Sequence, residues 1–386
     1  MMNKIESKES VEVSIMIPIL NEEEYIESTV YSVINGTENI ENMEFFLVDG
    51  GSTDKTLEIL DKLSKKYSFI KVLHNEKKEI APALNLAISE SSAKYIVRMD
   101  AHADFPNGYV HKLVNALKGL PNDVVNVGGI IETRPPNNSL IAQSIAIVSS
   151  SKIGVGNTTF RTENITEPRY VNTVPFGAYR KEALKKVGCF SENVPTSEDL
   201  ELGRKLLKAG MKILMLPDVK STYISRPDIK SFLIQHFDNG RCVTKENRGG
   251  IQSYYFSLKD LFSSLKNKVK QEKIDIEDGN EALSFYQTRH YIPLFFSLYL
   301  IGLLFLHKLY LSSNTGSLFT IFYIPIIIYT IMICSFGFIN AIKKMRPFLI
   351  IMLPIALLCL HLSYGFGSLY GIIQLIFPTL KSPSRK

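Results

Sequence analysis

The residues best suited to chemistry fall in three short polar clusters, and the first is rich in glycine. Residues 49–54 read Asp-Gly-Gly-Ser-Thr-Asp, directly after an apolar run and before a helical pattern. Glycines let the backbone approach a ligand closely, and Asp49 at a strand end can accept hydrogen bonds from a nucleobase or a ribose. A tight turn between strand and helix, with no ligand, is the alternative interpretation.

The second cluster, residues 97–104, reads Val-Arg-Met-Asp-Ala-His-Ala-Asp. Asp100 and His102 are two residues apart in an expected extended turn and should project to the same side. A carboxylate and an imidazole both bind Mn²⁺ or Mg²⁺, and the imidazole favours Mn²⁺. An ion held here would bridge a pyrophosphate and stabilise its charge as it leaves. A turn with solvated polar side chains is the alternative.

The third cluster, residues 196–201, reads Thr-Ser-Glu-Asp-Leu-Glu and opens a helical pattern. Carboxylates near a helix start ordinarily cap the helix and interact with its dipole, and this explains Glu201. Asp199, with Glu198 beside it, can do more if the turn faces the same crevice. It can then remove a proton from an acceptor hydroxyl.

The elements that must position these clusters alternate between short β-branched runs and amphipathic stretches up to about residue 225. We expect strands at Val13–Leu20, Phe45–Val48, Ile70–Leu73, Tyr95–Met99 and Val124–Ile131. We expect helices at Glu22–Val33, Lys55–Lys66, Ala83–Ser89 and Tyr109–Leu117. This alternation predicts a mostly parallel α/β sheet, whose ligands bind beyond the carboxyl ends of the strands. The loops at Asn21, 49–54 and 100–104 should therefore face one crevice.

Composition and charge exclude several classes of protein. The chain has 386 residues, 45% hydrophobic and 21% charged, enough for two or three folded units. Seven of its 44 basic residues and none of its 38 acidic residues lie in 291–386, so the remainder carries a charge near −1. We therefore expect no nucleic-acid partner. Four scattered cysteines predict no disulfide framework or zinc knuckle. The polar start is unlike a signal peptide, so we expect the body, residues 11–228, to be cytoplasmic.

A different pattern runs from Ile229 to Arg289. Apolar residues recur there at helical spacing with lysines between them, as at Tyr255, Leu258 and Lys259. A basic amphipathic helix can lie on an anionic membrane surface, so we expect residues 229–290 to form an interfacial segment. A solvated helix packed on the body is the alternative, and the pattern alone does not separate the two.

Three apolar blocks follow, at Tyr291–Leu311, Leu318–Ile339 and Phe348–Leu380. A helix needs ~20 apolar residues to cross a bilayer, so we expect about three transmembrane segments within 291–380. The positive-inside rule places the basic residues of 340–346 and 381–386 in the cytoplasm, whereas three crossings put the tail outside. The third block contains Pro354, Gly365 and Gly367, so one alternative is a broken, partly re-entrant segment. Three crossings with an external tail is the simpler count.

Six segments carry, in order and spacing, a resemblance to a known family. They are residues 13–23 (VSIMIPILNEE), 49–54 (DGGSTD), 83–87 (ALNLA), 97–103 (VRMDAHA), 176–182 (FGAYRKE) and 197–201 (SEDLE). Together they resemble a family 2 glycosyltransferase with a GT-A fold. The nearest subgroup is the membrane-bound succinoglycan type of exopolysaccharide glycosyltransferase, which also has His in its metal triplet. The resemblance covers about residues 11–310.

The resemblance implies a Rossmann-like mixed, mostly parallel sheet with flanking helices, and a role for each matching residue. It places Pro18, Leu20, Asn21 and Glu22 around the nucleotide, Asp49 at the base, Asn85, Arg98 and Asp100 at ribose and phosphate, Asp100 and His102 at a Mn²⁺ or Mg²⁺ ion, and Gly177 and Ala178 beside the donor sugar. Asp199, next to Glu198, becomes the general base of an inverting transfer, with no covalent glycosyl-enzyme. UDP is the nucleotide that the family implies.

Two departures from the family pattern bear on function. The metal triplet more usually ends in Asp, so His102 leaves the identity of the ion open. Processive members carry a QxxRW signature, whereas residues 235–239 read Gln-His-Phe-Asp-Asn and the chain has no Trp. We therefore expect a multi-pass inner-membrane enzyme that adds one sugar from a nucleotide sugar to a lipid-linked glycan in exopolysaccharide synthesis. A processive synthase and an inactive nucleotide-sugar-binding scaffold are the alternatives.

Overall fold

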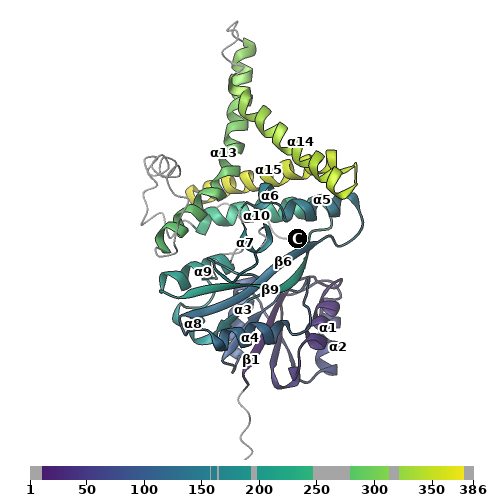
Figure 1. Ribbon diagram of the computed structural model, residues 1–386, viewed down its shortest axis with the longest axis vertical. Helices are drawn as coiled ribbons and strands as arrows, with labels where there is room; N and C mark the ends of the chain where they lie inside the picture. The colour runs from purple at the N-terminus through teal and green to yellow at the C-terminus, as the bar shows by residue number, and fades with distance from the viewer. Residues whose placement is uncertain are drawn as a thin grey trace, which may run out of the picture. The chain divides into compact units, whose positions relative to one another are not determined.

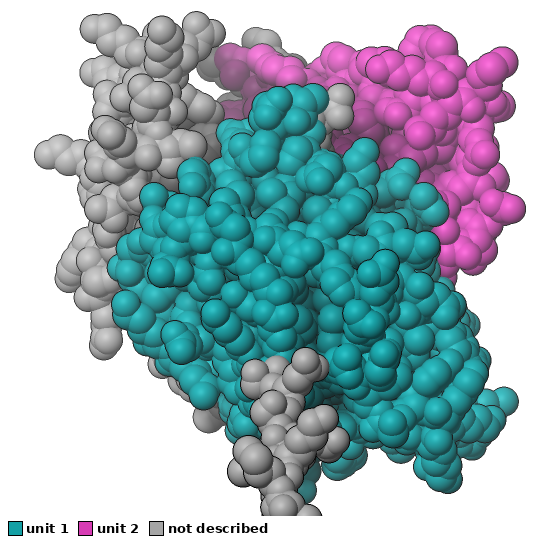
Figure 2. Space-filling model, turned by 60° about the horizontal axis from the view of Figure 1, so that its bottom comes forward, with its two compact units in different colours: residues 1–134, 157–224 teal, residues 135–156, 225–386 magenta. Residues whose placement is uncertain are grey.

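The computed structural model describes residues 11–156, 158–162, 165–192, 198–246, 279–312 and 321–377. The chain divides into two compact units (Figure 2). Unit 1 contains residues 1–134 and 157–224, and unit 2 contains residues 135–156 and 225–386. Residues 135–156, which lie in the sequence between the two parts of unit 1, thus belong to unit 2.

Unit 1 is built on one mixed sheet, whose first half is parallel. Its strands lie in the order β3 (Ile70–His74), β2 (Glu44–Asp49), β1 (Val13–Ile19) and β4 (Tyr95–Arg98). Each pairs in parallel with its neighbour, so their carboxyl ends meet at one edge. β1 and β2 are almost wholly buried, which explains why they appear in the sequence as continuous apolar runs.

The second half of the sheet contains antiparallel pairs. Its strands are β8 (Ala178–Arg180), β6 (Val124–Arg134), β9 (Lys212–Ile224), β5 (Ala103–Asp104) and β7 (Arg169–Tyr170). β8 is antiparallel to both β4 and β6, and β9 runs parallel to β6 and antiparallel to β5 and β7. The expected mixed sheet is confirmed.

Helices cover both faces of this sheet (Figure 1). They are α1 (Ile26–Gly36), α2 (Thr56–Lys66), α3 (Ile80–Glu90), α4 (Tyr109–Gly119), α7 (Thr159–Thr162), α8 (Lys181–Lys186) and α9 (Glu198–Lys208), with a short 3-10 turn at Ile40–Asn42. Because strand side chains alternate, Ile15 and Ile17 pack with α1 and α4, whereas Met16 packs with α3 on the opposite face.

One helix boundary differs from the sequence expectation, because α1 begins at Ile26 and not at Glu22. Asn21 has a positive φ of 54°, which turns the chain away from β1. The backbone N–H of Glu22 then donates to Thr56 Oγ1, at 2.8 Å, and that of Glu23 donates to Asp54 Oδ2, at 3.2 Å. The prediction of a helix over Glu22–Val33 is therefore wrong in its first turn, which instead forms part of a loop.

Unit 2 is helical in its described residues. It contains α5 (Leu140–Ser149), α6 (Lys152–Val155), α10 (Ile229–Glu246), α13 (Gly279–Ser312), α14 (Ile324–Lys344) and α15 (Leu349–Ile376). Three stretches are long and apolar enough to cross a membrane, namely Tyr291–Lys308, Ile321–Lys344 and Leu349–Gln374. α15 continues unbroken past Pro354, so the interpretation of the third block as a broken helix is wrong.

Two expectations from the sequence, the interfacial segment at 229–290 and the body at 11–228, agree with the structure only in part. The basic amphipathic pattern around Tyr255 and Lys259 lies outside the described residues. α10 forms the first part of the segment expected at 229–290. Residues 135–156, which the sequence placed inside a body of residues 11–228, fold with unit 2.

Candidate active site

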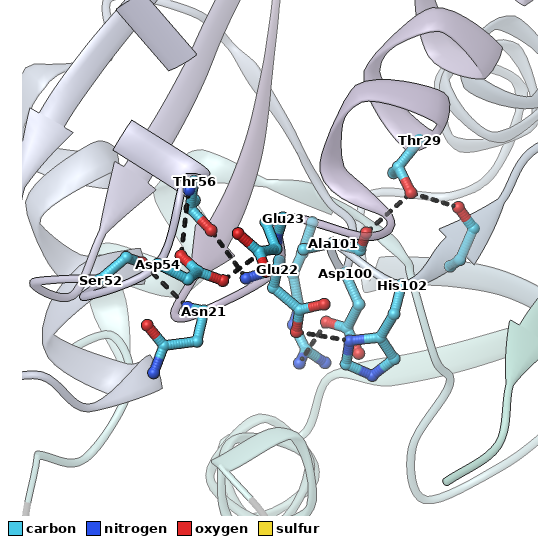
Figure 3. A network of polar contacts seen from close by, with 12 residues as sticks. Asn21, Glu22, Glu23, Thr29, Ser52, Asp54, Thr56, Asp100, Ala101 and His102 are labelled. Atoms are coloured by element: carbon cyan, nitrogen blue, oxygen red, sulfur yellow. Dashed lines mark hydrogen bonds and ion pairs between the residues drawn. The ribbon is translucent and has the colours of Figure 1, made fainter. Parts of the chain in front are cut away.

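The loops after β1 and β2 are joined by hydrogen bonds. The backbone N–H of Asn21 donates to Ser52 Oγ at 2.9 Å, and the N–H of Thr53 donates to Asn21 Oδ1 at 2.8 Å. The Glu22 N–H donates to Thr56 Oγ1, as Figure 3 shows. Two clusters that are about 30 residues apart in sequence therefore form one rim at the carboxyl end of the parallel strands.

The turn after β4 brings Asp100 and His102 to the same rim. His102 Nδ1 lies 2.9 Å from Glu22 Oε1, and Figure 3 shows these two side chains pointing toward each other beside Asp100. The turn is held against α1, because Thr29 Oγ1 donates to the carbonyl of Ala101 at 2.7 Å. The loop residue Glu22, expected at the nucleotide, thus lies next to the pair expected at the metal.

Arg98, the last residue of β4, joins the second and third polar clusters. Its Nη2 lies 2.9 Å from Asp100 Oδ1 and 2.9 Å from Glu198 Oε1, and its Nη1 donates to Asp199. Arg98 is 5% exposed, and its contact with Glu198 is buried, whereas its contacts with Asp100 and Asp199 are partly buried. The start of α9 is therefore fixed to the end of β4, one hundred residues earlier in the chain. The clusters that the sequence predicted to converge do so.

Two buried polar atoms at this junction lack hydrogen-bond partners among the described residues. They are Asp199 Oδ1 and Arg98 Nε. Buried polar atoms are nearly always hydrogen-bonded in folded proteins, so an unused acceptor and an unused donor on these two residues require an explanation. A bound ligand that carries both a hydroxyl group and an anionic oxygen would satisfy the two atoms.

Charge dominates this junction, with three carboxylates around one guanidinium. Burial alone would lower the pKa of Arg98, but the carboxylates of Asp100 and Glu198 outweigh it and raise the pKa. Burial would likewise lower the pKa of His102, but its contact with Glu22, with smaller contributions from Tyr223 and Asp100, raises the pKa to about 9. His102 is therefore an imidazolium paired with a carboxylate at neutral pH when no cation is bound.

Asp49 stabilises its own loop. Its carboxylate accepts hydrogen bonds from the backbone N–H of Gly51, at 2.7 Å, and of Ser52, at 3.2 Å, and the residue is fully buried. If Asp49 contacts a nucleobase, as predicted, its carboxylate oxygens must accept hydrogen bonds from the base and from the loop at the same time. Pro18 and Leu20, predicted to lie at the nucleotide, are half-buried at the end of β1 and just beyond it.

Asn85 lies apart from the junction at Arg98. On α3, its Nδ2 donates to the carbonyl of Phe190 at 2.9 Å and its Oδ1 accepts from the Phe190 N–H at 3.0 Å. Its amide also reaches Glu192 Oε1 at 3.3 Å. These bonds hold the loop before α9, so the structure gives Asn85 a positioning role, and its predicted contact with ribose or phosphate stays a prediction.

The backbones of Gly177 and Ala178 lie beside the backbone of β4 at Arg98. The carbonyl of Gly177 accepts a hydrogen bond from the Arg98 N–H at 3.0 Å. A Cβ at position 177 would lie 2.5 Å from Asn126 Oδ1, so the close packing of β6 and β8 requires glycine. The Ala178 side chain is fully buried. Their predicted place beside a donor sugar stays a prediction.

Two residues that the sequence analysis did not single out complete the rim. Tyr223 of β9 packs edge-on against His102, with ring centroids 5.3 Å apart. The guanidinium of Arg161, in α7, lies 4.5 Å from the centroid of the Tyr223 ring. Burial lowers the pKa of Arg161. Neither residue belongs to a recognisable motif, so only the fold could reveal these positions.

A divalent cation at this rim would have few protein ligands. In the part of the chain that the structure describes, no three His, Cys, Asp or Glu side chains are arranged to hold a metal ion. Asp100 and His102 provide one carboxylate and one imidazole, which suit Mn²⁺. The excess negative charge around Arg98 also favours a cation. The residues fit an ion that takes its other ligands from water and a diphosphate.

Comparison with protein families gives one match over this region. The model described as "Glycosyl transferase family 2" matches residues 14–188, which include Arg98, Asp100 and His102 and end before Glu198.

Two curated proteins and one solved structure illustrate the likeness. A dolichyl N-acetyl-alpha-D-glucosaminyl phosphate 3-beta-D-2,3-diacetamido-2,3-dideoxy-beta-D-glucuronosyltransferase of Methanococcus voltae is 31% identical over 257 residues, 65% of this chain and 77% of that protein. The succinoglycan biosynthesis protein ExoA of Rhizobium meliloti is 30% identical over 229 residues, 59% and 67% of the two chains. A mannosyltransferase of Pyrobaculum calidifontis, solved with GDP-mannose and Mn²⁺, superposes with a TM-score of 0.57 at 14% identity, covering 96% of this chain and 88% of that one.

Proposed function

Because the chain belongs to glycosyltransferase family 2, we propose that it transfers one sugar from a nucleotide-sugar donor to a hydroxyl group of a lipid-linked glycan. The product would enter a cell-surface or exported polysaccharide. Two observations support this choice of acceptor. The relatives named above act on a dolichyl phosphate glycan and in succinoglycan biosynthesis, and the described part of this chain has three helices long enough to cross a membrane.

The proposed reaction is a single displacement at the anomeric carbon. The carboxylate of Asp199 takes the proton of the acceptor hydroxyl, and the hydroxyl oxygen forms the new bond to the anomeric carbon. The bond from that carbon to the diphosphate breaks at the same time, and the nucleoside diphosphate leaves with the electron pair. The configuration at the anomeric carbon is therefore inverted.

Arg98 links donor binding to the freedom of this base. In the structure its guanidinium holds Asp199, and Asp199 Oδ1 has no partner among the described residues. A donor diphosphate is the stronger partner for a guanidinium, because it carries more charge and can accept two parallel hydrogen bonds. In our proposal the donor engages Arg98 and releases Asp199 for the acceptor. The base would then be available only when a donor is bound.

Asp100 and His102 would hold a Mn²⁺ or Mg²⁺ ion together with the donor phosphates. Such an ion, when bound, neutralises the charge that develops on the leaving diphosphate. His102 would have to lose its proton to serve as a ligand, and Glu22, which pairs with it in the structure, lies close enough to accept that proton.

One observation supports this function above the rest, namely the convergence of Asp100, Glu198 and Asp199 on Arg98. A structural ion pair needs one carboxylate for one guanidinium, and this junction has three. An excess of carboxylates around one buried guanidinium is costly unless a cation or a substrate joins them. An enzyme that binds a cation and a hydroxyl acceptor at this position explains the excess.

The test is donor turnover by the full chain in membranes, with Mn²⁺ or Mg²⁺ and a panel of UDP- and GDP-sugars. We expect Asp199→Asn to lower transfer by about 10²- to 10⁴-fold, the range that a general base contributes. Donor binding should persist, because the substitution removes a base and not a ligand of the donor. Chelation of divalent cations should abolish turnover in the wild type.

Glu201→Gln is the matched control, because Glu201 is on the same helix and has other partners. Its carboxylate accepts from Ser191 Oγ at 2.7 Å and lies 3.7 Å from Lys205 Nζ. We expect this variant to transfer sugar at close to the wild-type rate. Wild-type turnover by Asp199→Asn would eliminate Asp199 as the base.

A further inference from the structure

The last helix, α15, presents two different faces. One face is an apolar stripe that is exposed or half-buried in the chain, made of Ile351, Ile355, Leu358, Leu362, Phe366, Leu369 and Ile373. The spacing of three and four residues keeps this stripe on one side of the helix throughout. The other face is packed against protein, with Leu353, Leu357 and Leu360 fully buried or nearly so. A helix that simply crosses a membrane needs no such long protein-facing side.

The second half of α15 packs along α10, a helix with polar and charged side chains. Ser363 Oγ donates to the carbonyl of Leu233 at 2.6 Å, and a Cβ at Gly367 would lie 2.0 Å from the carbonyl of Phe237. A Cβ at Gly240 of α10 would likewise lie 2.0 Å from the carbonyl of Tyr364. The two backbones are therefore in close contact around residues 363–368, next to the centre of α15.

α10 is poorly suited to the hydrocarbon core, because it carries charge beside this contact. Arg241 Nη2 is paired with Asp238 Oδ1 at 2.9 Å, and both side chains are buried in the chain. Lys230 and the Lys245-Glu246 pair add charge at the two ends of the helix. If α15 crossed the bilayer, its centre near Leu362 would hold this ion pair within the hydrocarbon core.

The first half of α15 packs against α5, which is too short to cross. α5 has ten residues, and its Ile145 and Val148 are buried with Leu353 and Leu357 of α15. A crossing helix needs ~20 residues. Figure 1 shows α5 and α10 running beside α15 as one layer. Helices that do not span a membrane thus line much of the protein-facing side of α15, and α13 and α14 contact the remainder.

The contact with α13 places the centre of α15 at the edge of the membrane. A Cβ at Gly365 would lie 2.0 Å from Ser297 Oγ and 2.3 Å from the carbonyl of Pro293. Both α13 residues fall in the first seven positions of its apolar stretch, Tyr291–Lys308. If α13 crosses the bilayer, this part of it lies near one surface, and so does the middle of α15.

The apolar stretch of α15 is also more buried inside the chain than the other two. Inside the chain, 17% of the α13 stretch and 11% of the α14 stretch are buried, against 39% of the α15 stretch. α13 and α14 rise away from the layer of α15, α10 and α5 in Figure 1. They expose apolar side chains such as Leu304 and Ile328, as helices surrounded by lipid must.

Charge along the sequence agrees with two crossings. Basic residues occur in 259–273 and at Arg289 before the apolar stretch of α13, in 343–346 at the end of α14, and in 381–386 at the tail. Residues 313–320 carry no charge, and Lys308 is the one basic residue at the other end of the α13 stretch. Two crossings put all three basic groups on one side and the uncharged connection on the other, as the positive-inside rule requires. A third crossing would move the basic tail to the opposite side.

We infer that α15 lies in the plane of the cytoplasmic membrane surface, with its apolar stripe in the lipid, and that only α13 and α14 cross. The apolar stripe is covered by lipid of the cytoplasmic leaflet, at the boundary between headgroups and acyl chains. The 28 residues of α15 extend over about 42 Å, longer than the ~30 Å hydrocarbon core. The inference concerns membrane placement and does not depend on the proposed reaction.

The absence of tryptophan from the chain allows a direct measurement of depth. Single tryptophans are introduced on the stripe as Ile351→Trp, Leu358→Trp, Phe366→Trp and Ile373→Trp. The full chain is reconstituted in phosphatidylcholine vesicles that contain lipids brominated at different acyl carbons, and fluorescence quenching gives the depth. We expect the four sites to share one shallow depth, about 5–10 Å below the headgroups.

Ile301→Trp supplies the deep reference, because Ile301 is exposed and lies near the middle of the α13 stretch. A crossing α15 would put Leu358→Trp and Phe366→Trp about 6 Å from the bilayer centre and as deep as Ile301→Trp. That outcome would overturn the inference, and so would an absence of quenching at all four stripe sites. An unfolding temperature equal to that of the wild type in detergent shows that each variant is folded.

The side of the tail gives a second, independent readout. A protease site is inserted in the connection 313–320 and another after Lys386, and each is tested in right-side-out and inside-out vesicles. We expect the tail to be cut only in inside-out vesicles and the connection only in right-side-out vesicles. Cleavage of both in the same vesicles would contradict two crossings.

Discussion

At the scale of single residues, the site depends on one guanidinium that holds three carboxylates. Arg98 contacts Asp100, Glu198 and Asp199, and its backbone N–H is bonded to Gly177. The types and local spacing of these residues were visible in the sequence, and so was their place at strand or helix ends. The pairing of Arg98 with carboxylates one hundred residues away was not visible, because no local pattern indicates which carboxylate contacts which guanidinium.

The competition at Arg98 predicts how nucleotide affinity changes when the base is removed. Asp199→Asn removes a negative charge beside the expected phosphate position and weakens the hold on Nη1. We therefore expect a nucleoside diphosphate to bind the variant more tightly, by about fivefold, or ~1 kcal/mol. Calorimetric titration of the full chain in detergent with UDP and GDP, in the presence of Mn²⁺, measures this change.

Two comparisons make the affinity prediction specific. Glu201→Gln should leave the affinity unchanged, because its carboxylate is bonded to Ser191 and not to Arg98. Weaker nucleotide binding by Asp199→Asn would mean that Asp199 helps to hold the donor, and the proposed exchange at Arg98 would then be wrong.

At the scale of elements, the parallel strands were predicted well and the loops between them less well. Each of the five expected strands exists within one to three residues of its expected ends, because buried β-branched runs leave little choice. The first turn of the helix expected at Glu22 is instead a loop bonded to Thr56 and Asp54. The short strand β8 and the segment α5 were missed, because three residues or an apolar decapeptide carry no distinctive period.

The amino-terminal ends of β1 and β2 are tied together by Glu44, which gives a prediction about pH. Glu44 accepts from Ser14 Oγ at 2.5 Å and from the N–H and Oγ of Ser92 at 3.0 Å each. Burial would raise its pKa, but these hydrogen bonds and nearby Lys71 outweigh it and lower the pKa below the ordinary 4.5. The carboxylate therefore stabilises the fold above pH 4.5, and this contribution is lost as pH falls through the lowered value.

We expect Glu44→Gln to reduce the free energy of unfolding at pH 7 by about 1–3 kcal/mol, the value of hydrogen bonds to a charged group. The gap between wild type and variant should narrow as the pH drops below 4.5. Thermal unfolding followed by circular dichroism in detergent measures both. Asp61→Asn is the control, since the exposed pair of Asp61 and Lys65 should contribute little at any pH. A gap that stays constant from pH 7 to 4 would contradict the prediction.

At the scale of the whole molecule, the units do not follow the boundaries expected from the sequence. Composition changes sharply near residue 228, and the sequence analysis placed the end of the body there. The structure instead assigns residues 135–156 to the unit that holds the apolar helices. Sequence reasoning missed this because α5, at ten residues, is too short to register as a membrane-associated segment. Only its burial with α15 reveals which unit it joins.

This interleaving predicts that a fragment ending at residue 228 will behave poorly. In such a fragment Ile145 and Val148 lose the α15 side chains that bury them, and an apolar helix becomes exposed. We expect residues 1–228 to aggregate without detergent, as judged by gel filtration. β6 ends at Arg134 and contacts α7, which begins at Thr159, so a short glycine-serine linker can replace residues 135–156. We expect the fragment with that replacement to be monomeric and to bind a nucleoside diphosphate. Equal solubility of both fragments would show that α5 is not what ties the catalytic unit to the rest of the chain.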